Sequence, residues 1–343
     1  MENNTASRRQ FLQTCGLLGL SVAAGGVLPA VAEAARFDGK EHSITQTRLQ
    51  MGTLVTLTAV HPSRAKAEEA LGRAFEEIDR LSLIFSRYDS STPVSVLNRD
   101  GRVSGINPEL AEVMNRALRF GSLTDDAFNI TVKPVVDLFR QKQNLKGEMR
   151  LSEDEFHQAI NLVDAKGVAL GRDSIRLQRE GMGVTLDGIA KGYIVDKASA
   201  VLSAHGVNRH MINAGGDIRT SGGKAEGKPW VVAIQDPAKK RNYPATISMY
   251  DGAIATSGGY EVFYDRQRMY SHLVSPQTGN SPHSVLSVSV TAPTVMEADT
   301  LATAVYIMQA RKGLQFIDSL TNRECLVLGR NGAAYASRHW GKA

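Results

Sequence analysis

The most informative part of the sequence includes the stretch Leu186-Asp187-Gly188-Ile189-Ala190-Lys191-Gly192-Tyr193. Its glycine turn opens a predicted helix that ends near Gly206, and the free N–H groups and positive dipole end of such a helix suit a phosphate. Lys191 lies about one helical turn past the start, where its ammonium adds a point charge within reach of a bound anion. The same pattern also fits an ordinary exposed lysine after a glycine entry turn.

A second glycine turn, Asn213-Ala214-Gly215-Gly216-Asp217, follows the apolar pair Met211-Ile212 and therefore ends a predicted strand. The paired glycines let the backbone approach a ligand closely, which leaves Asn213 and Asp217 to contact the polar edges of a sugar or base. Taken alone, the motif is more typical of a tight hairpin turn. Neither stretch has the spacing of a Walker A loop or of a Gly-x-Gly-x-x-Gly fingerprint, so a conventional Rossmann fold is not predicted.

The residues upstream of these motifs predict one strand and three helices. Residues 51–60 are apolar and β-branched and indicate the strand, after which Ser63 caps an amphipathic helix. A second helix is expected at Asn107-Pro108, with a side-chain cap and a proline in its first turn, and a third after the capping-box residue Ser152. The core positions of the first helix recur at helical spacing and are Ala70, Ala74, Ile78, Leu81 and Phe85.

The second half of the chain is richer in strands and glycine. Short β-like segments cover residues 230–234, 245–249, 285–291 and 325–329, and a last helix covers residues 296–309. No repeat of fixed period and no low-complexity linker is visible. We therefore expect a single two-lobed α+β domain with mixed or antiparallel sheets and flanking helices.

Two hydroxyl-rich segments in the second half are candidates for contacts with a phosphate or a flavin ring. The first, residues 254–260, contains Thr256 and Ser257, and the second, residues 271–279, contains His272. A lone histidine is more often structural. The position of His272 between two hydroxyl-rich loops nevertheless makes it a candidate proton acceptor near neutral pH.

Asp299 and Thr303 stand four residues apart in the last predicted helix and therefore on one face of it. A carboxylate and a hydroxyl in this arrangement can share one hard cation with phosphate oxygens. The alternative is a first-turn aspartate that complements the helix dipole beside a packed threonine. These two residues alone favour that alternative.

The composition indicates a globular protein without a nucleic-acid partner. The 343 residues are 42% hydrophobic and carry 40 basic against 35 acidic side chains, with no long run of like charges. A nucleic-acid partner would require a clustered basic face. Cys325 falls in a predicted core strand, where a buried thiol is expected.

The first 34 residues have the features of a twin-arginine export signal. Ser7-Arg8-Arg9-Gln10-Phe11-Leu12 precedes an apolar run over residues 16–28 and a small-residue cleavage site at 32–34. The run is rich in glycine and alanine and shorter than the ~20 residues of a spanning helix, which disfavours an uncleaved anchor. We expect cleavage, a mature domain over residues 35–343, and a periplasmic location reached in the folded state.

Further motifs are Met51-Gly52-Thr53, residues 85–98 and Phe128-Asn129-Ile130-Thr131-Val132. Together with the five segments described above, they occur in the order found in the ApbE family of FAD:protein FMN transferases. The chain resembles this family from about residue 45 to about residue 335. Each motif is weak by itself, but their shared order covers nearly the whole mature chain.

The resemblance implies an ApbE-like domain that binds extended FAD between two lobes, with Mg²⁺ on its pyrophosphate. Asp299 and Thr303 would bind the metal together with a main-chain carbonyl at Gly188, and Lys191 would neutralise phosphate charge. His272 would be the base for an incoming threonine hydroxyl. The residues that would contact FAD are Met51, Asp187, Gly188, Lys191, Asn213, Gly215, Gly216, Asp217, Thr256 and Ser257.

One position departs from the family. Ser275 stands where the family usually carries an acidic or amide residue in front of a proline. A serine cannot supply that carboxylate, so we expect His272 to be oriented by some other group.

The implied reaction is Mg²⁺-dependent transfer of FMN from FAD to a threonine side chain of a partner flavoprotein, with release of AMP. Two alternatives are open: a periplasmic FAD carrier without transferase activity, and an FAD pyrophosphatase that yields FMN and AMP. The expected partner is an exported or membrane-bound flavoprotein, either of nitrous oxide respiration or of a redox-driven pump. The sequence does not identify it.

Overall fold

The computed structural model describes residues 35–37, 41–143, 148–237 and 243–341. The predicted export signal, residues 1–34, lies outside the described residues. Within the described ranges, none of the helices is both long enough and apolar enough to span a membrane.

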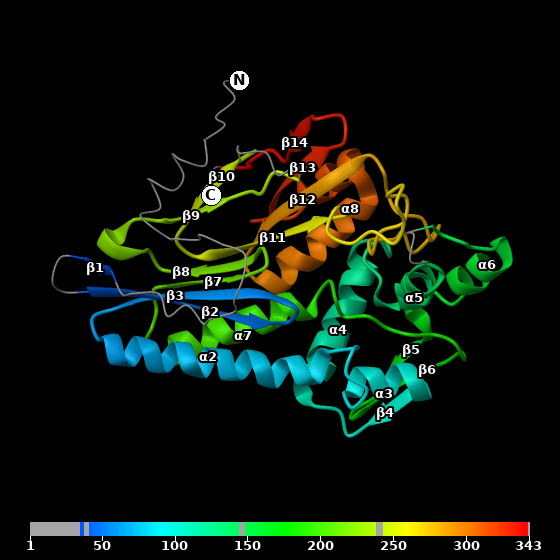
Figure 1. The fold of residues 1–343 in the computed structure, drawn as a ribbon, viewed down its shortest axis with the longest axis horizontal. Coiled ribbons are helices and arrows are strands. Elements are labelled where there is room, and N and C mark those ends of the chain that lie inside the picture. The colour runs from blue at the N-terminus through cyan, green and yellow to red at the C-terminus, as the bar shows by residue number, and fades with distance from the viewer. Residues whose placement is uncertain (1–34, 38–40, 144–147, 238–242, 342–343) are drawn as a thin grey trace.

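One large antiparallel sheet is the centre of the fold (Figure 1). Side chains alternate between the two faces of each strand, and the apolar side chains of this sheet contribute to two buried clusters. From edge to edge the strands are β1 (Ala35–Phe37), β2 (Glu41–Gln50), β3 (Thr53–His61), β7 (His210–Ala214), β8 (Asp217–Ser221), β11 (Gly252–Gly258), β12 (Val285–Ala292), β13 (Glu324–Gly329) and β14 (Ala334–Ala336).

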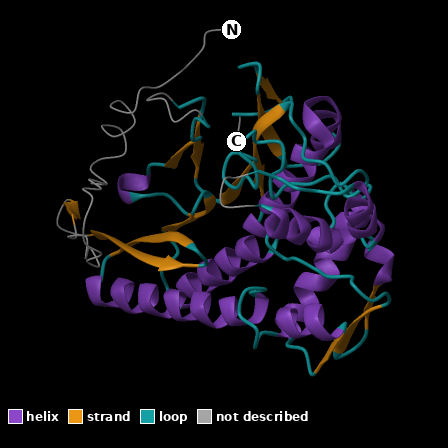
Figure 2. Cartoon of the chain, turned by 45° about the vertical axis from the view of Figure 1, so that its right-hand side comes forward, coloured by secondary structure: helices purple, strands orange, loops and turns teal. Residues whose placement is uncertain are grey.

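Three long helices, α2 (Arg64–Phe85), α7 (Ala190–Ala204) and α8 (Val295–Ile317), pack on one face of this sheet (Figures 1 and 2). As predicted, Ser63 caps α2, because its hydroxyl accepts a hydrogen bond from the Lys66 N–H. The predicted core positions of α2 are all buried in the main apolar cluster: Ala70, Ala74, Ile78, Leu81 and Phe85.

A two-stranded hairpin, β9 (Trp230–Ala233) and β10 (Thr246–Met249), covers part of the opposite face of the sheet. Its buried side chains form a second apolar cluster with Ile218 of β8 and Ile254 of β11. The sheet is therefore the middle layer between helices on one side and a hairpin on the other.

The segment between α2 and α7 adds most of the smaller helices and a three-stranded antiparallel sheet of order β4-β6-β5. Phe139 in this segment packs against Phe156 and Tyr270, which ties it to the loop that carries His272. The elements are α3 (Pro93–Asp100), β4 (Arg102–Ser104), α4 (Pro108–Leu123), η1 (Ile130–Val132), α5 (Lys133–Lys142), α6 (Glu153–Asn161), η2 (Ala165–Gly167), β5 (Val168–Leu170) and β6 (Ser174–Leu177).

The structure confirms the predicted α+β class with antiparallel sheets and flanking helices, but it corrects several element ends. Met51 does not begin a strand: Met51 and Gly52 form the turn between β2 and β3, and Met51 has a φ of 51°. Asn107 precedes α4 as expected, but its side chain makes no capping hydrogen bond, so Pro108 at the first turn marks the start. The last helix begins at Val295, and its predicted end at Gln309 coincides with a non-helical residue that kinks the chain before a further helical stretch continues to Ile317.

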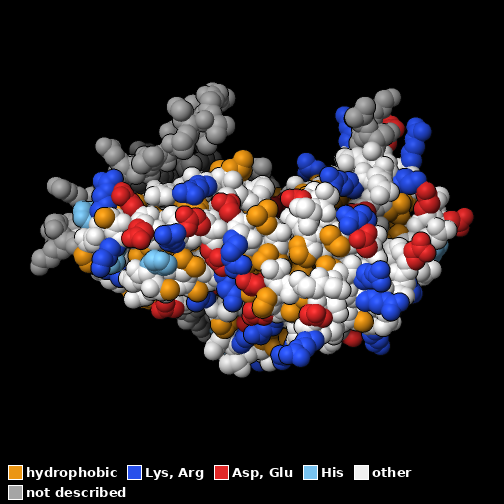
Figure 3. Space-filling view, turned by 90° about the horizontal axis from the view of Figure 1, so that it is seen from below, with side chains coloured by type: hydrophobic (Ala, Val, Ile, Leu, Met, Phe, Trp, Pro, Cys, Tyr) orange, Lys and Arg blue, Asp and Glu red, His pale blue; other side chains and the backbone are white. Residues whose placement is uncertain are grey.

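Charges of both signs are interspersed on the face shown in Figure 3, and no single large basic field is visible there. Along α2, for example, Arg64 pairs with Glu68 and Arg73 pairs with Glu76. Exposed pairs of this kind keep a helix surface soluble and contribute little to stability.

Candidate active site

Two turns and one strand end lie at the same end of the main sheet. The strand registers place the Met51-Gly52 turn, the Gly215-Gly216 turn and the C-terminal end of β11 side by side. Gly215 and Gly216 have φ angles of 62° and 102°, which glycine adopts without steric cost. A Cβ on Gly215 would lie 2.4 Å from Thr53 Oγ1, so two of the turns touch each other.

The predicted nucleotide contacts on the strands occupy both faces of this sheet end. Because side chains alternate along a strand, Asp217 and Ser257 face the helices, whereas Asn213 and Thr256 face the opposite side. Asn213 Oδ1 accepts a hydrogen bond of 3.0 Å from a backbone N–H of its own turn, and Thr256 Oγ1 lies 2.7 Å from Ser289 Oγ. The structure therefore brings these residues to one end of the sheet but not to one surface.

Lys191, Asp217 and Asp299 form a buried charged cluster between the sheet and the first turns of α7 and α8. The two carboxylates are 2% and 7% exposed. Lys191 Nζ lies 3.1 Å from Asp217 Oδ2, but the angles of this ion pair are not those of a hydrogen bond, so the oxygen has no donor among the described residues. Asp299 Oδ2 is likewise buried without a hydrogen-bond partner in the described part of the chain.

Burial and like-charge repulsion shift the protonation of this cluster. Burial raises the pKa of Asp217, with Lys191 acting in the opposite direction. The pKa of Asp299 lies well above its usual range because of burial and the nearby charge of Asp217. Burial alone would lower the pKa of Lys191, but the two carboxylates outweigh it and raise that pKa, so the ammonium stays charged.

The surroundings of Asp299 fit a magnesium ion. Thr303, one turn further along α8, has its Oγ1 3.3 Å from Ser257 Oγ, and a Cβ on Gly188 would lie 3.1 Å from that same Thr303 oxygen. The Gly188 carbonyl faces α8, since Thr300 Oγ1 lies 3.4 Å from it. Carboxylate, hydroxyl and carbonyl oxygens are the ligands that Mg²⁺ prefers, and the partnerless Asp299 Oδ2 supplies the negative charge.

This set contains one carboxylate only. In agreement, the described residues contain no group of three or more His, Cys, Asp or Glu side chains that would hold a metal by themselves. Mg²⁺ commonly keeps waters and binds substrate phosphates in addition to one or two carboxylates. The site therefore suits a cation that arrives with a phosphate-bearing ligand.

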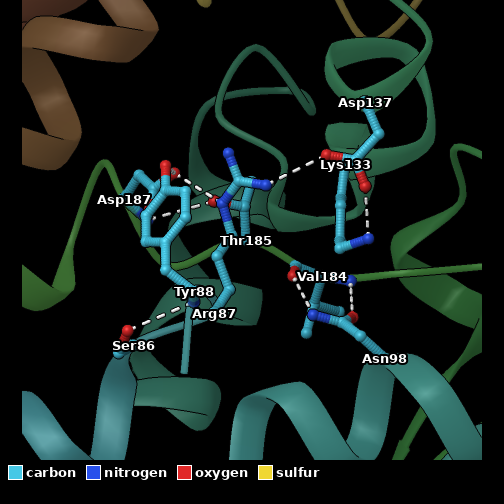
Figure 4. A network of polar contacts seen from close by, with 9 residues as sticks. All are labelled: Ser86, Arg87, Tyr88, Asn98, Lys133, Asp137, Val184, Thr185 and Asp187. Carbon is cyan, nitrogen blue, oxygen red and sulfur yellow. Dashed lines mark hydrogen bonds and ion pairs between the residues drawn. The ribbon is translucent and has the colours of Figure 1, made fainter. Parts of the chain in front are cut away.

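Asp187 belongs to a network of charged side chains that joins three segments of the chain (Figure 4). Arg87 Nε donates to Asp187 Oδ2 at 2.8 Å, and Arg87 Nη1 donates to Asp137 Oδ1 at 3.0 Å. Lys133 also pairs with Asp137, and the Tyr88 hydroxyl lies 3.4 Å from Asp187 Oδ2. Asp187 thus has a charged partner already, while about half of its side chain stays exposed.

His272 lies in the loop after β11 and is oriented by the backbone. The backbone N–H of His272 donates to the Val262 carbonyl at 3.3 Å, and the ring Nδ1 of His272 lies 3.4 Å from the same oxygen. Ser275 caps a turn instead, because its hydroxyl accepts a hydrogen bond of 3.3 Å from the Thr278 N–H. The hydrogen-bond contact of Nδ1 is therefore with a carbonyl and not with the side chain at position 275.

The imidazole of His272 reaches solvent in part, yet protein surrounds most of it. This desolvation lowers the pKa of His272, so the ring is neutral near pH 7. A neutral imidazole with one free ring nitrogen can accept a proton.

The contacts of two charged residues are not predicted from the sequence, although Arg87 falls within the motif at residues 85–98. Arg87 and Asp196 resemble ordinary surface charges at a helix end and on a helix, although Arg87 reaches Asp187 and Asp196 reaches the start of α8. The available signals were that Arg87 follows Ser86, the C-cap of α2, and that Asp196 lies one turn after Gly192 on the same face.

The sheet end combines glycine turns, two helix N-termini and an acidic pair with one lysine. These features define an α+β protein whose site suits a phosphate-bearing ligand together with a hard cation. The chain belongs to the ApbE family, whose family model matches residues 51–327. The resemblance drawn from the order of the motifs is thereby confirmed.

Curated relatives with the name FAD:protein FMN transferase match most of the chain. The protein from Salmonella typhimurium is 27% identical over 280 residues, which covers 78% of this chain and 79% of the relative. The protein from Klebsiella pneumoniae is 27% identical over 324 residues and covers 91% and 89%.

Solved structures of the family have the same fold. The ApbE protein of Thermotoga maritima superposes with a TM-score of 0.79 at 26% identity and covers 87% of this chain and 98% of its own. The flavin transferase ApbE of Vibrio cholerae gives a TM-score of 0.75 at 25% identity, again over 87% and 98%.

Proposed function

We propose that this protein transfers FMN from FAD to the hydroxyl of a threonine in a partner flavoprotein, with Mg²⁺ bound and AMP released. The observation that carries the proposal is the buried cluster of Lys191, Asp217 and Asp299 at the meeting point of two helix N-termini. The buried Asp299 Oδ2, which has no hydrogen-bond partner among the described residues, calls for a cation, and the lysine and helix ends suit phosphate. The names of the curated relatives support the same reaction.

In the proposed reaction the threonine oxygen forms a bond to the FMN-side phosphorus, and the bond from that phosphorus to the oxygen bridging to AMP breaks. The threonine proton passes to His272, and AMP leaves with the bridging oxygen. Bound Mg²⁺, held by Asp299, Thr303 and the Gly188 carbonyl, would supply positive charge to the pyrophosphate oxygens. Lys191 adds a fixed positive charge beside them, and the glycine turns admit the nucleotide to the sheet end.

The buried cluster of Lys191, Asp217 and Asp299 contains two carboxylates and one ammonium, and the cation site that this implies favours transfer over simple FAD storage. A carrier needs affinity for FAD but no cation site and no proton acceptor. Ser275 would favour the carrier alternative only if the residue at this position had to orient His272. The Ser275 hydroxyl caps a turn instead. The pyrophosphatase alternative uses the same groups with water in place of threonine, so the acceptor decides between them.

The test is to incubate the protein with FAD, Mg²⁺ and a fragment of a periplasmic flavoprotein that contains a flavinylation threonine. Mass spectrometry then reads covalent FMN on the fragment and AMP in solution. Label that is lost without Mg²⁺ supports the transferase. Tight FAD binding without label or AMP supports the carrier, and free FMN with AMP supports the pyrophosphatase.

Asp299→Asn should lower the rate of transfer about 100-fold or more, because it removes the charged metal ligand and leaves the size of the side chain unchanged. Rates at saturating FAD over a range of Mg²⁺ concentrations measure this. Asp173→Asn is the matched control, because Asp173 is exposed and is not among the residues of the candidate site. Transfer by Asp299→Asn at the rate of this control would remove the metal assignment.

We also propose that the protein works in the periplasm after export by the twin-arginine route. The support is the sequence of residues 1–34, and an exported or membrane-bound acceptor fits the same location. This acceptor is a flavoprotein of nitrous oxide respiration or of a redox-driven pump.

A further inference from the structure

Asp196 links the two helices that carry Lys191 and Asp299. It lies on α7, and its carboxylate accepts hydrogen bonds from the N–H groups of Val295 and Met296, each at 3.0 Å. Val295 and Met296 are the first two residues of α8. Their N–H groups have no acceptor inside their own helix, so a side chain of another helix satisfies them.

The two helices also touch through their backbones at this point. Gly192 lies one turn before Asp196, and a Cβ on Gly192 would lie 2.6 Å from Met296 N and from the Val295 carbonyl oxygen. Any side chain at position 192 would therefore push α8 away from α7. Asp196 and Gly192 together fix both the distance and the register of the first turns.

The start of α8 has a cap of its own as well. Thr294 occupies the N-cap position, and its hydroxyl accepts a hydrogen bond from the Glu297 N–H at 3.3 Å. A local cap of this kind is enough to begin a helix. The second acceptor, Asp196, adds what a local cap cannot, namely a fixed position of α8 relative to α7.

We propose that Asp196 is a positioning residue that holds the metal ligand Asp299 against Lys191 and the Gly188 turn. Asp299 follows Val295 by one turn on α8, and Lys191 precedes Gly192 on α7, so the link lies within one turn of both groups. A misplacement of about 1 Å at such a site costs up to about 100-fold in rate. This inference rests on the proposed function for its metal site and adds a residue to it.

The experiment compares Asp196→Ala with Thr294→Ala. Both variants remove a cap from the same helix end and should lower thermal stability similarly, but only Asp196→Ala cuts the link to α7. Binding of Mn²⁺ to the FAD-loaded full-length protein, read by electron paramagnetic resonance, measures the metal site without any transfer step. Asp196→Ala should weaken Mn²⁺ binding about tenfold or more, and Thr294→Ala less than about twofold.

Equal Mn²⁺ affinity in Asp196→Ala and wild type, or equal losses in both variants, would overturn the proposal. Asp196→Asn serves if the alanine variant does not fold, since the amide oxygen still accepts one of the two hydrogen bonds, and it should show a smaller shift in the same direction. FAD affinity should change less than Mn²⁺ affinity in each case. Because Mn²⁺ binding needs no acceptor protein, a failure of FMN transfer in the wild type would count against the proposed function and not against this link.

Discussion

Asp217 and Asp299 bring two carboxylates into a space where the described residues supply the single ammonium of Lys191. A buried carboxylate oxygen without a partner costs about 1–3 kcal/mol or more. For Asp299 Oδ2 this cost falls between the first turns of α7 and α8. Such a residue set is typical of a functional site, where stability is given up for ligand binding.

His272→Ala should lower the rate of transfer at least about 100-fold and change the affinity for FAD less than about threefold, because the ring acts on the acceptor proton. Transfer is followed by mass spectrometry and FAD binding by fluorescence. With His272 present, the rate should fall only below pH 6.5, since the pKa of His272 is lowered from that value.

The matched control is His283→Ala, at an exposed histidine that follows the same loop. This variant should keep both the rate and the pH dependence of the wild type. A large loss of FAD affinity in His272→Ala would show that His272 binds FAD and does not act as the proton acceptor.

His210 makes the stability of the fold depend on pH. The ring is fully buried, its Nε2 lies 2.7 Å from Ser199 Oγ, and its Nδ1 lies 2.7 Å from the Val207 carbonyl. Burial lowers the pKa of His210 from 6.5 to about 4. The unfolded chain therefore binds a proton between these values while the folded chain does not, and stability is lost as the pH falls through this window.

The free energy of unfolding should fall by about 2 kcal/mol from this group between about pH 7 and about pH 4.5. Urea titrations at the two pH values measure the difference. His210→Gln should lose stability at both values and show a smaller difference between them, whereas His205→Gln, at an exposed histidine, should keep the wild-type difference. An unchanged difference in His210→Gln would contradict the assignment.

Arg87 is the contact that joins α2, α5 and the turn before α7. Its guanidinium is 7% exposed and binds Asp137 and Asp187. Arg87→Met should lower the free energy of unfolding by about 2 kcal/mol or more, because both carboxylates lose a buried partner, and Arg87→Lys should recover part of it.

Urea unfolding of Arg99→Met provides the comparison. Arg99 pairs with Asp100 while both side chains are about half exposed, so its loss should cost less than about 1 kcal/mol. Equal losses of stability in Arg87→Met and Arg99→Met would contradict the role of Arg87 in joining α2, α5 and the turn before α7.

Elements with local signals were predictable from the sequence. A serine cap and apolar residues at helical spacing specify α2, and the capping box at Ser152 specifies α6, where Ser152 indeed accepts from the Glu155 N–H. Strand β11 lacks such a signal, because Gly252–Gly258 is built of small residues without apolar alternation. Its place in the sheet comes from pairing with β8 and β12.

The candidate site divides in the same way. Glycine turns and a lysine near a helix start lie close together in the sequence and identify Lys191 and Asp217 as candidates, whereas Asp299 is a candidate from its spacing to Thr303 and from the family resemblance. The links between those residues are not local. Asp196 finds its partners about 100 residues further along, and Arg87 and Asp187 are 100 positions apart. Spacing along one helix or strand contains no information about such pairs.

The molecule as a whole is a folded unit with its main core around one sheet, which suits an export route that carries folded proteins. The proposed twin-arginine route makes a testable prediction: replacing Arg8 and Arg9 by lysine should retain the protein in the cytoplasm, because the arginine pair is the feature that such a route reads. Fractionation of cells with an antibody to the mature domain measures this. Arg73→Lys, on the surface of α2, should be exported normally, and normal export of the double variant would exclude the route.

The position of the candidate contacts on both faces of one sheet end has a consequence for how the protein diversifies. Asp217 and Ser257 share their face with the helices and the proposed cation, whereas Asn213 and Thr256 share the other with the hairpin. A substitution at Thr256, whose hydroxyl contacts Ser289 on the hairpin face, need not disturb Ser257 and Thr303 on the helix face. A change of the FAD contacts on one face can therefore accumulate while the proposed cation site on the other face stays intact.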